Sequence, residues 1–290
     1  MRQYAREELI QSLQSKIRKK EPVIASGAGA GIVASAGEKA GLDLLIIYST
    51  GLFRQAGAPL LTTMLPYGNC NDIVSALGKK VIFRTVDIPV IGAIGAADPF
   101  KSWDLIIDGL QETGFSGMIN YPVFTGIDGF ADDLEDSGIG FSRNVNLIRK
   151  CRERDFFSAS FAFEEAQAEM LAAAGADMIC AMVGGTAGGT NAIKENKVRS
   201  MEESCRIIQN IYEAATSVNP DIIVTCRGGP IVEGRRICSA ASIIRMYRGL
   251  SGAPVSNGSR WSARSFMQQK NFLALTHKLG GRGWESEELI

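Results

Sequence analysis

A regular alternation of short apolar runs and longer stretches of helical period constrains this chain more than any other feature. The short runs are rich in residues that favour β-strands, and the alternation continues along the chain. Such a pattern is typical of parallel βαβ units, in which each helix carries the chain back to begin the next strand. We predict strands at residues 23–26, 44–48, 90–94, 117–120, 156–160, 178–182, 222–226 and 249–252.

Eight strand and helix units in about 250 residues fit a (βα)8 TIM barrel better than an open doubly wound sheet. The opening residues place Leu9, Leu13 and Ile17 on one helical face, so we predict an extra N-terminal helix that closes the bottom of the barrel. No linker of distinct composition divides the chain. We therefore predict a single α/β domain, 1–290, with a capping helix at 1–21, the barrel at 22–252, and a C-terminal helix and tail at 253–290.

The charges of the chain balance, because 31 Lys and Arg residues face 31 Asp and Glu residues. A chain without excess positive charge lacks the electrostatic footprint of a nucleic-acid-binding protein. Its start has no apolar signal-peptide core, and no run approaches the roughly 20 apolar residues that span a bilayer. We expect a cytoplasmic protein with neither nucleic acid nor membrane as a partner.

Cysteine and histidine usage excludes several kinds of site. The six cysteines have no CxxC spacing, which favours reduced thiols over a zinc site or a redox pair. His277 is the sole histidine, so a metal site built from several histidines is excluded. It lies near the end of a predicted helix, where the helix dipole favours it, and this interpretation is preferred to a catalytic one.

In a TIM barrel the functional groups come from the loops after the strands, and here these loops are rich in glycine. SGAGAG (26–31) follows the first predicted strand, YSTG (48–51) the second and VGGTAGGTN (183–191) the sixth. Glycine lets backbone N–H groups approach a ligand closely, so the first and third loops could bind an anion at a helix start. The chemistry of tight turns explains the same glycines equally well.

A series of motifs at and near the predicted strand ends gives a more specific indication of the kind of barrel. YSTGLFRQAG (48–57), LPYGNCND (65–72), ADPF (97–100), GFSGMINYPVFTGIDG (114–129), AGADM (174–178) and CRGGPI (226–231) follow in that order. Together they resemble the phosphoenolpyruvate hydrolase-like TIM-barrel family, from about residue 22 to about residue 251. The resemblance implies a branch of the phosphoenolpyruvate/pyruvate-domain barrels, whose better-known members make or break C–C or C–P bonds next to a 2-oxo acid with help from Mg²⁺.

Two departures mark the chain as a divergent member. Met182 and Arg227 stand where members of the family usually have histidines, near the ends of the sixth and seventh strands. Both substitutions remove an imidazole from the expected mouth of the barrel. Arg227 offers instead a permanent positive charge with a fork of donors suited to a carboxylate or a phosphate.

Polar residues at the strand ends are the candidate catalytic groups. Asp98 matches a position from which related barrels hold Mg²⁺ or its waters, although Asp-Pro is also a common helix start. Asn120 closes the fourth strand and could donate a hydrogen bond to an enolate oxygen, or stabilise the next turn. The hydroxyl of Tyr48 could orient a substrate. Glu164 could act as a base if an apolar setting raised its pKa, or simply favour a helix start.

We therefore predict a catalytic set and a substrate-binding set, with Mg²⁺ as a cofactor that Asp98 could hold. The catalytic set is Asp98, Asn120, Tyr48 and Glu164. The substrate-binding set is Arg227, Ser26, Gly27, Arg54, Gly184, Gly185 and Gly228.

The leading hypothesis is a lyase or hydrolase that acts on a small 2-oxo acid or β-dicarbonyl compound through an enolate. A second hypothesis is a barrel retuned without metal for a larger intermediate of secondary metabolism, lined by Met182, Phe53, Phe124 and Phe161. A third is a non-catalytic barrel that binds a ligand or regulates. Apolar residues on more than one side of the C-terminal helix predict a homo-oligomer.

Overall fold

The computed structural model describes the chain except for residues 1, 20, 66, 124–129, 186–197 and 232–290. In the described ranges, strands and helices alternate, and the strands form one parallel sheet in the order β1-β2-β3-β4-β5-β6-β7. The strands are β1 (Ala25–Gly27), β2 (Leu44–Ile47), β3 (Val90–Ile94), β4 (Gly117–Asn120), β5 (Phe157–Ala162), β6 (Met178–Met182) and β7 (Ile223–Arg227).

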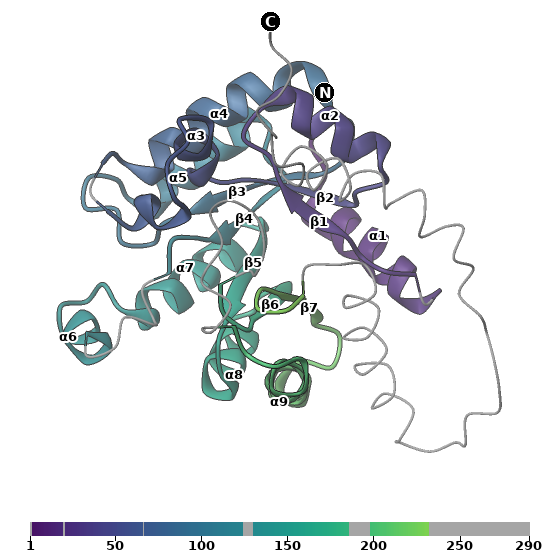
Figure 1. Ribbon diagram of the computed structural model, residues 1–290, viewed down its shortest axis with the longest axis vertical. Helices are drawn as coiled ribbons and strands as arrows, with labels where there is room; N and C mark the ends of the chain where they lie inside the picture. The colour runs from purple at the N-terminus through teal and green to yellow at the C-terminus, as the bar shows by residue number, and fades with distance from the viewer. Residues whose placement is uncertain (1, 20, 66, 124–129, 186–197, 232–290) are drawn as a thin grey trace, which may run out of the picture. The chain divides into compact units, whose positions relative to one another are not determined.

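The helices between these strands follow the predicted βα alternation (Figure 1). They are α1 (Arg6–Arg18), α2 (Gly31–Lys39), α3 (Thr50–Gln55), the 3-10 helix η1 (Leu60–Met64), α4 (Cys70–Thr85), α5 (Trp103–Thr113), α6 (Ala131–Asp136), α7 (Phe141–Glu153), α8 (Glu165–Ala173) and α9 (Met201–Val218). The α/β class with a curled parallel sheet is confirmed. The predicted eighth strand at 249–252, the C-terminal helix at 253–290 and His277 lie outside the described residues.

Two compact units divide the chain. The first comprises Met1–Met182 and Arg206–Cys226, and the second comprises Val183–Cys205 and Arg227–Ile290. The single domain at 1–290 stays a prediction. In the described ranges every cysteine is a free thiol. The same ranges contain no helix with the length and hydropathy of a transmembrane span.

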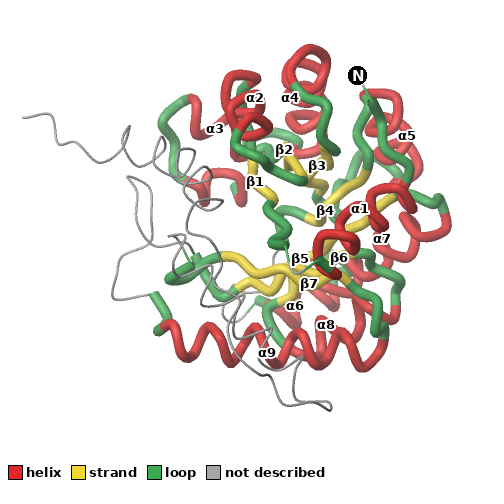
Figure 2. The backbone as a smooth tube through the Cα atoms, turned by 90° about the vertical axis from the view of Figure 1, so that its right-hand side faces the viewer, coloured by secondary structure: helices red, strands yellow, loops and turns green. Residues whose placement is uncertain are grey.

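The sheet of the first unit has a helix-facing side and an inner side (Figure 2). Gly92 faces the helices, because a Cβ there would lie 2.9 Å from Leu110 and 3.3 Å from Val74. Residues paired in parallel strands share a face, so the partners of Gly92, which are Ile47 and Met118, face the helices too. Strands β2 to β6 are buried along almost their whole length, which is why β2, β3 and β6 consist mainly of apolar residues, whereas β1 and β7 are more exposed.

Helix ends are set by local residues. Asn69 begins α4, since its side chain accepts hydrogen bonds from the backbone nitrogens of Asn71 and Asp72. Ser102 caps α5 in the same way through the nitrogen of Leu105, and α5 ends at Gly114 in the left-handed conformation, with φ of 101°. These two caps fix the loops that precede α4 and α5 at the carboxyl ends of the strands.

Helix α1 lies across the amino ends of the strands. Arg6 donates to both carboxylate oxygens of Asp177, the residue before β6, over 3.0 and 2.6 Å. Lys16 pairs with Asp43, the residue before β2, over 2.5 Å. The backbone nitrogen of Tyr4, just ahead of the helix, donates to the hydroxyl of Ser116, the residue before β4. The helix therefore covers this end of the sheet with ion pairs and hydrogen bonds.

Candidate functional site

Asp98 lies in the loop after β3 and is 8% exposed. Its Oδ2 accepts hydrogen bonds from the side-chain amides of Asn69, at 2.8 Å, and Asn71, at 2.9 Å. Its Oδ1 accepts one from the backbone nitrogen of Phe100, at 2.9 Å. We call Asp98, Asn69 and Asn71 the asparagine–aspartate cluster. It joins the start of α4 to the loop after β3 at the carboxyl end of the sheet.

The environment keeps the Asp98 carboxyl group ionised. Burial raises its pKa, but hydrogen bonds from Asn69, Phe100 and Asn71, together with the charge of Lys101, outweigh burial and hold the pKa below its usual value. An acid with a lowered pKa is deprotonated at neutral pH and is a weak base. Asp98 is therefore suited to electrostatic binding and orientation rather than to carrying a proton.

Asn71 is a residue of the cluster that the predicted site omits. Its Oδ1 accepts from the backbone nitrogen of Gly95 at 2.9 Å, and its Nδ2 donates to the Gly95 carbonyl at 3.1 Å as well as to Asp98. A Cβ at Gly95 would lie 2.8 Å from Sγ of Cys70, so only glycine fits this approach. The motif LPYGNCND contains Asn69 and Asn71, and the helix-capping pattern was the signal that could have found Asn69.

The described side chains do not fit a Mg²⁺ ion that the protein alone would hold. The described ranges contain no group of three His, Cys, Asp or Glu residues able to bind a metal ion together. Asp98 already accepts two hydrogen bonds at Oδ2 and one at Oδ1, which leaves it little acceptor capacity. Mg²⁺ requires an octahedral set of oxygen ligands. The asparagine–aspartate cluster therefore supplies one carboxylate ligand at most, and we assign no chemical step to a metal.

Asn120 is the last residue of β4 and is fully buried. Its Oδ1 accepts a hydrogen bond from the backbone nitrogen of Phe161 in β5, at 2.9 Å. Its Nδ2 has no hydrogen-bond partner in the described part of the chain. A buried N–H group without a partner is costly, by about 1–3 kcal/mol. Asn120 therefore carries a spare donor at the carboxyl end of the sheet.

Asn120 does not share a face with the aromatic side chains at this end. It pairs with Ile94 in register, which places it on the helix-facing side with Gly92. The hydrogen bond to β5 shows that its side chain reaches sideways along the end of the sheet. The structure brings Asn120 close to the loop after β3 along the backbone, because Tyr121 donates its N–H to the carbonyl of Ile94 at 2.8 Å.

Three aromatic rings meet on the inner side of the sheet. Tyr48, which follows β2, contacts Tyr121 edge to face with ring centroids 5.2 Å apart, and Tyr121 contacts Phe161 at 6.2 Å. Tyr48 is 9% exposed. A Cβ at Gly27 would lie 3.0 Å from the Tyr48 ring, so this predicted binding residue supports the ring by close approach. Phe124, also predicted to line a pocket, lies outside the described residues.

The remaining predicted residues of the first unit lie at its edges. Ser26 in β1 is half-buried, whereas Arg54 on α3 and Glu164 before α8 are exposed. The loop after β1 packs closely against the start of α3, because a Cβ at Gly29 would lie 2.7 Å from the Cα of Gly51. Glu164 makes no side-chain capping hydrogen bond at the start of α8. It lies in water rather than in an apolar setting.

Arg227 belongs to the second unit, where it closes β7. Its carbonyl accepts a hydrogen bond from the backbone nitrogen of Val183 at 3.1 Å, and Arg199 also donates to the Val183 carbonyl at 3.1 Å. Within this unit the loops after β6 and β7 are thus joined through their backbones. The role of Arg227 in carboxylate binding stays a prediction.

The predicted glycines of the second unit are needed for this backbone contact. Gly228 has φ of 95°, and a Cβ there would lie 2.1 Å from the carbonyl oxygen of Gly184. The backbone nitrogen of Gly229 donates to the carbonyl of Gly185 at 3.1 Å. Close packing of two loops explains these glycines, and anion binding by them stays a prediction.

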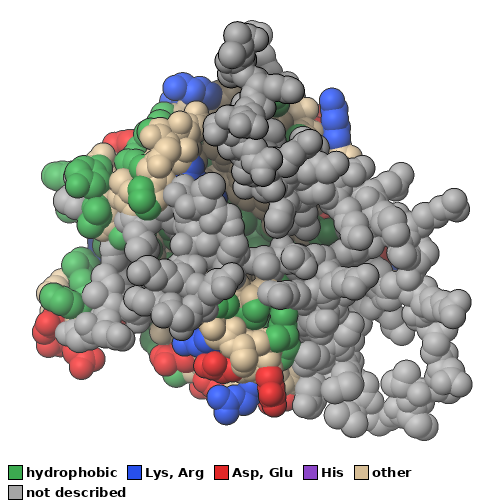
Figure 3. Space-filling model, viewed as in Figure 1, with side chains coloured by type: hydrophobic (Ala, Val, Ile, Leu, Met, Phe, Trp, Pro, Cys, Tyr) green, Lys and Arg blue, Asp and Glu red, His purple; other side chains and the backbone are tan. Residues whose placement is uncertain are grey.

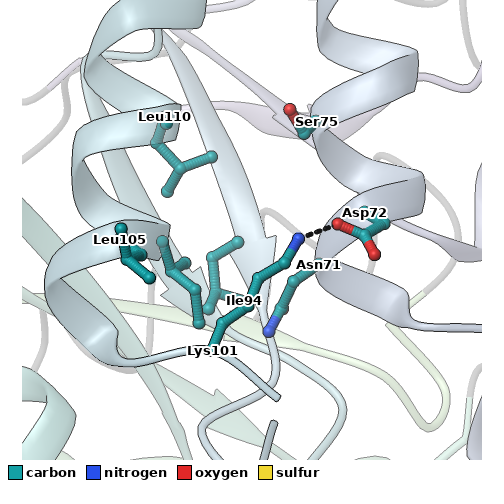
Figure 4. Close-up of a pocket in the computed structure, with 9 residues that line it drawn as sticks. Asn71, Asp72, Ser75, Ile94, Lys101, Leu105 and Leu110 are labelled. Atoms are coloured by element: carbon teal, nitrogen blue, oxygen red, sulfur yellow. Dashed lines mark hydrogen bonds and ion pairs between the residues drawn. The ribbon is translucent and has the colours of Figure 1, made fainter.

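A small pocket lies between α4 and α5 on the helix-facing side of β3 (Figure 4). Its volume is about 70 Å³, and Asn71 and Ile94 are among the residues that line it. Lys101 forms an ion pair with Asp72 across its opening (Figure 4). A cavity of this size holds only a few water molecules. It is a gap between packed helices beside the asparagine–aspartate cluster rather than a substrate site.

Comparison with known proteins assigns a family. Residues 8–270 match the family described as phosphoenolpyruvate hydrolase-like. The chain is 35% identical over 245 residues to the tomato (Solanum lycopersicum) "ToMV susceptible protein tm-1(GCR26)", a match that covers 84% of this chain and 32% of the relative. It is 26% identical over 254 residues to a "putative transcriptional regulatory protein" of Sinorhizobium fredii, which covers 87% of this chain and 41% of the relative.

The chain thus spans between about a third and two fifths of the length of these curated relatives.

Among solved structures it is similar to a phosphonopyruvate hydrolase in complex with oxalate and Mg²⁺, with 14% identity, a TM-score of 0.47, and coverage of 93% of this chain and 98% of that one. It is also similar to a phosphoenolpyruvate phosphomutase of Streptomyces platensis, with 13% identity, a TM-score of 0.49, and coverage of 94% and 99%. The match over residues 8–270 decides the assignment, and the chain belongs to the phosphoenolpyruvate hydrolase-like family.

Proposed function

We propose that the chain is an enzyme that acts on a small 2-oxo acid or β-dicarbonyl compound. It would break or form a C–C or C–P bond next to the carbonyl group through an enolate-type intermediate. The observation that carries the proposal is the buried Nδ2 of Asn120, a donor without a partner in the described chain at the carboxyl end of a parallel sheet. This is the end at which barrels of this class place their functional groups.

Asn120 is suited to stabilise the oxygen on which negative charge develops. Its Oδ1 is occupied by the Phe161 N–H, which fixes the amide, so its Nδ2 can donate without reorganisation. A fixed donor of this kind stabilises an enolate oxygen more than the neutral carbonyl of the ground state. The amide thus supplies the oxyanion interaction that the proposed reaction requires.

The other roles follow from the charge of each group. Asp98, held ionised by its amide partners, would orient a substrate hydroxyl or a bound water. Tyr48, buried at the end of β2, is the better placed of the two predicted proton carriers, because Glu164 is exposed. In the alternative of a barrel retuned without metal, the aromatic rings on the inner side of the sheet would form an apolar wall for a larger substrate.

The test is exchange of the protons next to the carbonyl of pyruvate and oxaloacetate in D₂O, followed by NMR. The protein should accelerate exchange, and Asn120→Ala should reduce the rate by about 10²–10³-fold, as for loss of one oxyanion donor. Asn146→Ala, an exposed asparagine on α7, is the matched control and should leave the rate unchanged. Equal rates for Asn120→Ala and the wild type would remove the assigned role.

A non-catalytic binding barrel is the second candidate function. The curated relatives favour it, because one is named for virus susceptibility and another as a putative regulator. The chain covers only part of each, so the activity and partners of a whole protein of that kind are proposals here. Saturable binding of oxalate, without any acceleration of proton exchange on pyruvate or oxaloacetate, would favour this candidate. The predicted homo-oligomer stays a prediction, which sedimentation at the mass of one chain would contradict.

A further inference from the structure

Arg143 is fixed in an unusual way at the carboxyl end of the first unit. It is the third residue of α7, and its Nε donates to the carbonyl oxygen of Ala96, two residues before Asp98, at 2.8 Å. Its guanidinium carbon lies 5.1 Å from the centroid of the Trp103 ring. Nε1 of Trp103 donates to the same Ala96 carbonyl at 3.0 Å. One backbone oxygen therefore anchors side chains from two helices.

This arrangement leaves the outer half of the guanidinium unused. Nη1 and Nη2 of Arg143 make no hydrogen bond or ion pair to any residue in the described ranges, although the side chain is half-buried. Arg154, at the other end of α7, differs because its guanidinium forms ion pairs with Asp104, at 2.7 Å, and with Asp108. Nη1 and Nη2 of Arg143 are not among the buried polar atoms that lack a partner, so they remain accessible to water and to a ligand.

Nearby acidic residues do not neutralise Arg143. The short helix α6, which precedes α7, carries an exposed acidic surface (Figure 3). Its members are Asp132, Asp133, Glu135 and Asp136. Glu135 is engaged elsewhere, since it accepts a hydrogen bond from the backbone nitrogen of Ser142 at 2.8 Å. No residue of α6 forms an ion pair with Arg143.

We infer that Arg143 is an anion-binding residue that takes the carboxylate or phosphate group of a small molecule at the carboxyl end of the sheet. The bond to Ala96 and the stacking on Trp103 fix the plane of the guanidinium before any ligand arrives. The two free nitrogens then form a fork that matches two oxygens of a carboxylate or phosphate. The inference is independent of the proposed reaction, because an enzyme and a binding barrel would both use such a site.

The experiment follows the side-chain Nε–H resonance of Arg143 by NMR during titration with inorganic phosphate, and separately with oxalate, at constant ionic strength. The wild type should show a saturable shift. Arg143→Gln should raise the dissociation constant by at least about tenfold, which is the loss of affinity expected when charged hydrogen bonds are removed. Arg143→Lys keeps the charge but loses the fork, and should bind with intermediate affinity. Arg149→Gln, an exposed arginine on the same helix, is the matched control and should bind like the wild type.

Two results would overturn the inference. One is no saturable shift in the wild type with either anion. The other is an unchanged dissociation constant in Arg143→Gln with lowered thermal stability, which would show that Arg143 only joins α7 to the loop after β3. Failure of the proposed reaction is distinguishable from both, because it would leave the anion titration intact while proton exchange on 2-oxo acids is absent.

Discussion

The two ends of the parallel sheet in the first unit contain buried aspartates in opposite settings. At the amino end, Asp177 meets the charged guanidinium of Arg6 and also accepts a hydrogen bond from the backbone nitrogen of Ser158 at 3.0 Å. At the carboxyl end, the hydrogen bonds that Asp98 accepts from described residues all come from uncharged N–H groups. The first end closes its polar groups against a helix of the same chain, whereas the second leaves an anion and a spare donor, Nδ2 of Asn120, in place.

The difference also appears in the direction of the pKa shifts. Burial raises the pKa of Asp177 and outweighs the hydrogen bond and charge of Arg6. Hydrogen bonds from the amides of the cluster outweigh burial at Asp98 and lower its pKa. One polar group near the amino end is an exception to this contrast, because the buried hydroxyl of Ser158 in β5 lacks a hydrogen-bond partner in the described chain. The amino end is closed mainly by contacts within the chain, and ligand chemistry at the carboxyl end stays a proposal.

The largest expected effect is at the amino end. Arg6→Met should lower the free energy of unfolding by about 3–5 kcal/mol, because it leaves the buried carboxylate of Asp177 without its cation. Arg18→Met, an exposed residue on the same helix, should change it by less than about 0.5 kcal/mol. Urea unfolding followed by circular dichroism measures both. A loss for Arg6→Met no larger than for Arg18→Met would show that α1 does not stabilise this end.

The next effect is at the carboxyl end. Asn71→Asp removes the donor to Oδ2 of Asp98 and adds a second carboxylate beside it, so the pKa of Asp98 should rise. We also expect a loss of about 1–3 kcal/mol in the free energy of unfolding at neutral pH. Carbon-13 NMR titration of the carboxyl groups measures the shift, with Asn146→Asp on the surface of α7 as control. An Asp98 that titrates as in the wild type would remove Asn71 as its positioning residue.

The pH dependence of stability should separate the two aspartates by sign. The lowered pKa of Asp98 means that its contribution is present above the usual aspartate value, about 3.9, and is lost as the pH falls through its folded value. The raised pKa of Asp177 means that its contribution is present below about 3.9 and is lost as the pH rises through its folded value.

Unfolding measured between about pH 3 and pH 6 tests this contrast. The stability of the wild type relative to Asp98→Asn should increase with pH, and its stability relative to Asp177→Asn should decrease with pH. Slopes of the same sign for the two variants would contradict the opposite settings of the two ends.

The smallest effect should come from the ion pair at the edge of the small pocket. Lys101 and Asp72 have side chains that are 37% and 57% exposed, and exposed pairs contribute about 0–1 kcal/mol. Lys101→Ala should therefore change the free energy of unfolding by less than about 1 kcal/mol. It should also raise the pKa of Asp98 slightly, because Lys101 is one of the groups that lower it. A larger loss of stability would show that this ion pair contributes substantially to the packing of α4 against α5.

The central strands of the sheet could be predicted because they are buried and therefore mainly apolar. The predicted limits at 90–94, 117–120 and 178–182 agree with β3, β4 and β6, which consist mainly of apolar residues and glycine. The first strand was predicted at 23–26 but lies at Ala25–Gly27, since its ends depend on pairing with β2 rather than on its own composition. Local patterns fix the existence of a strand, and tertiary pairing fixes its ends.

The candidate site was predictable only where a polar residue ends a strand or lies in the loop after it. Asp98 and Asn120 could be named from that rule. Asn71 and Arg143 could not, because each lies in the first turn of a helix and reaches a loop 24 and 47 residues away. Sequence spacing carries no signal for such contacts, which arise from the packing of α4 and α7 against the loop after β3.

The most direct test of the account is the side-chain amide resonance of Asn120 during titration with oxalate, a mimic of a planar enolate. We predict a saturable downfield shift of its Nδ2 protons, because the buried donor gains an acceptor, and the shift should be unaffected in Asn146→Ala. An amide resonance that stays constant while oxalate binds elsewhere, or does not bind, would contradict the claim that the carboxyl end of this sheet is the functional end.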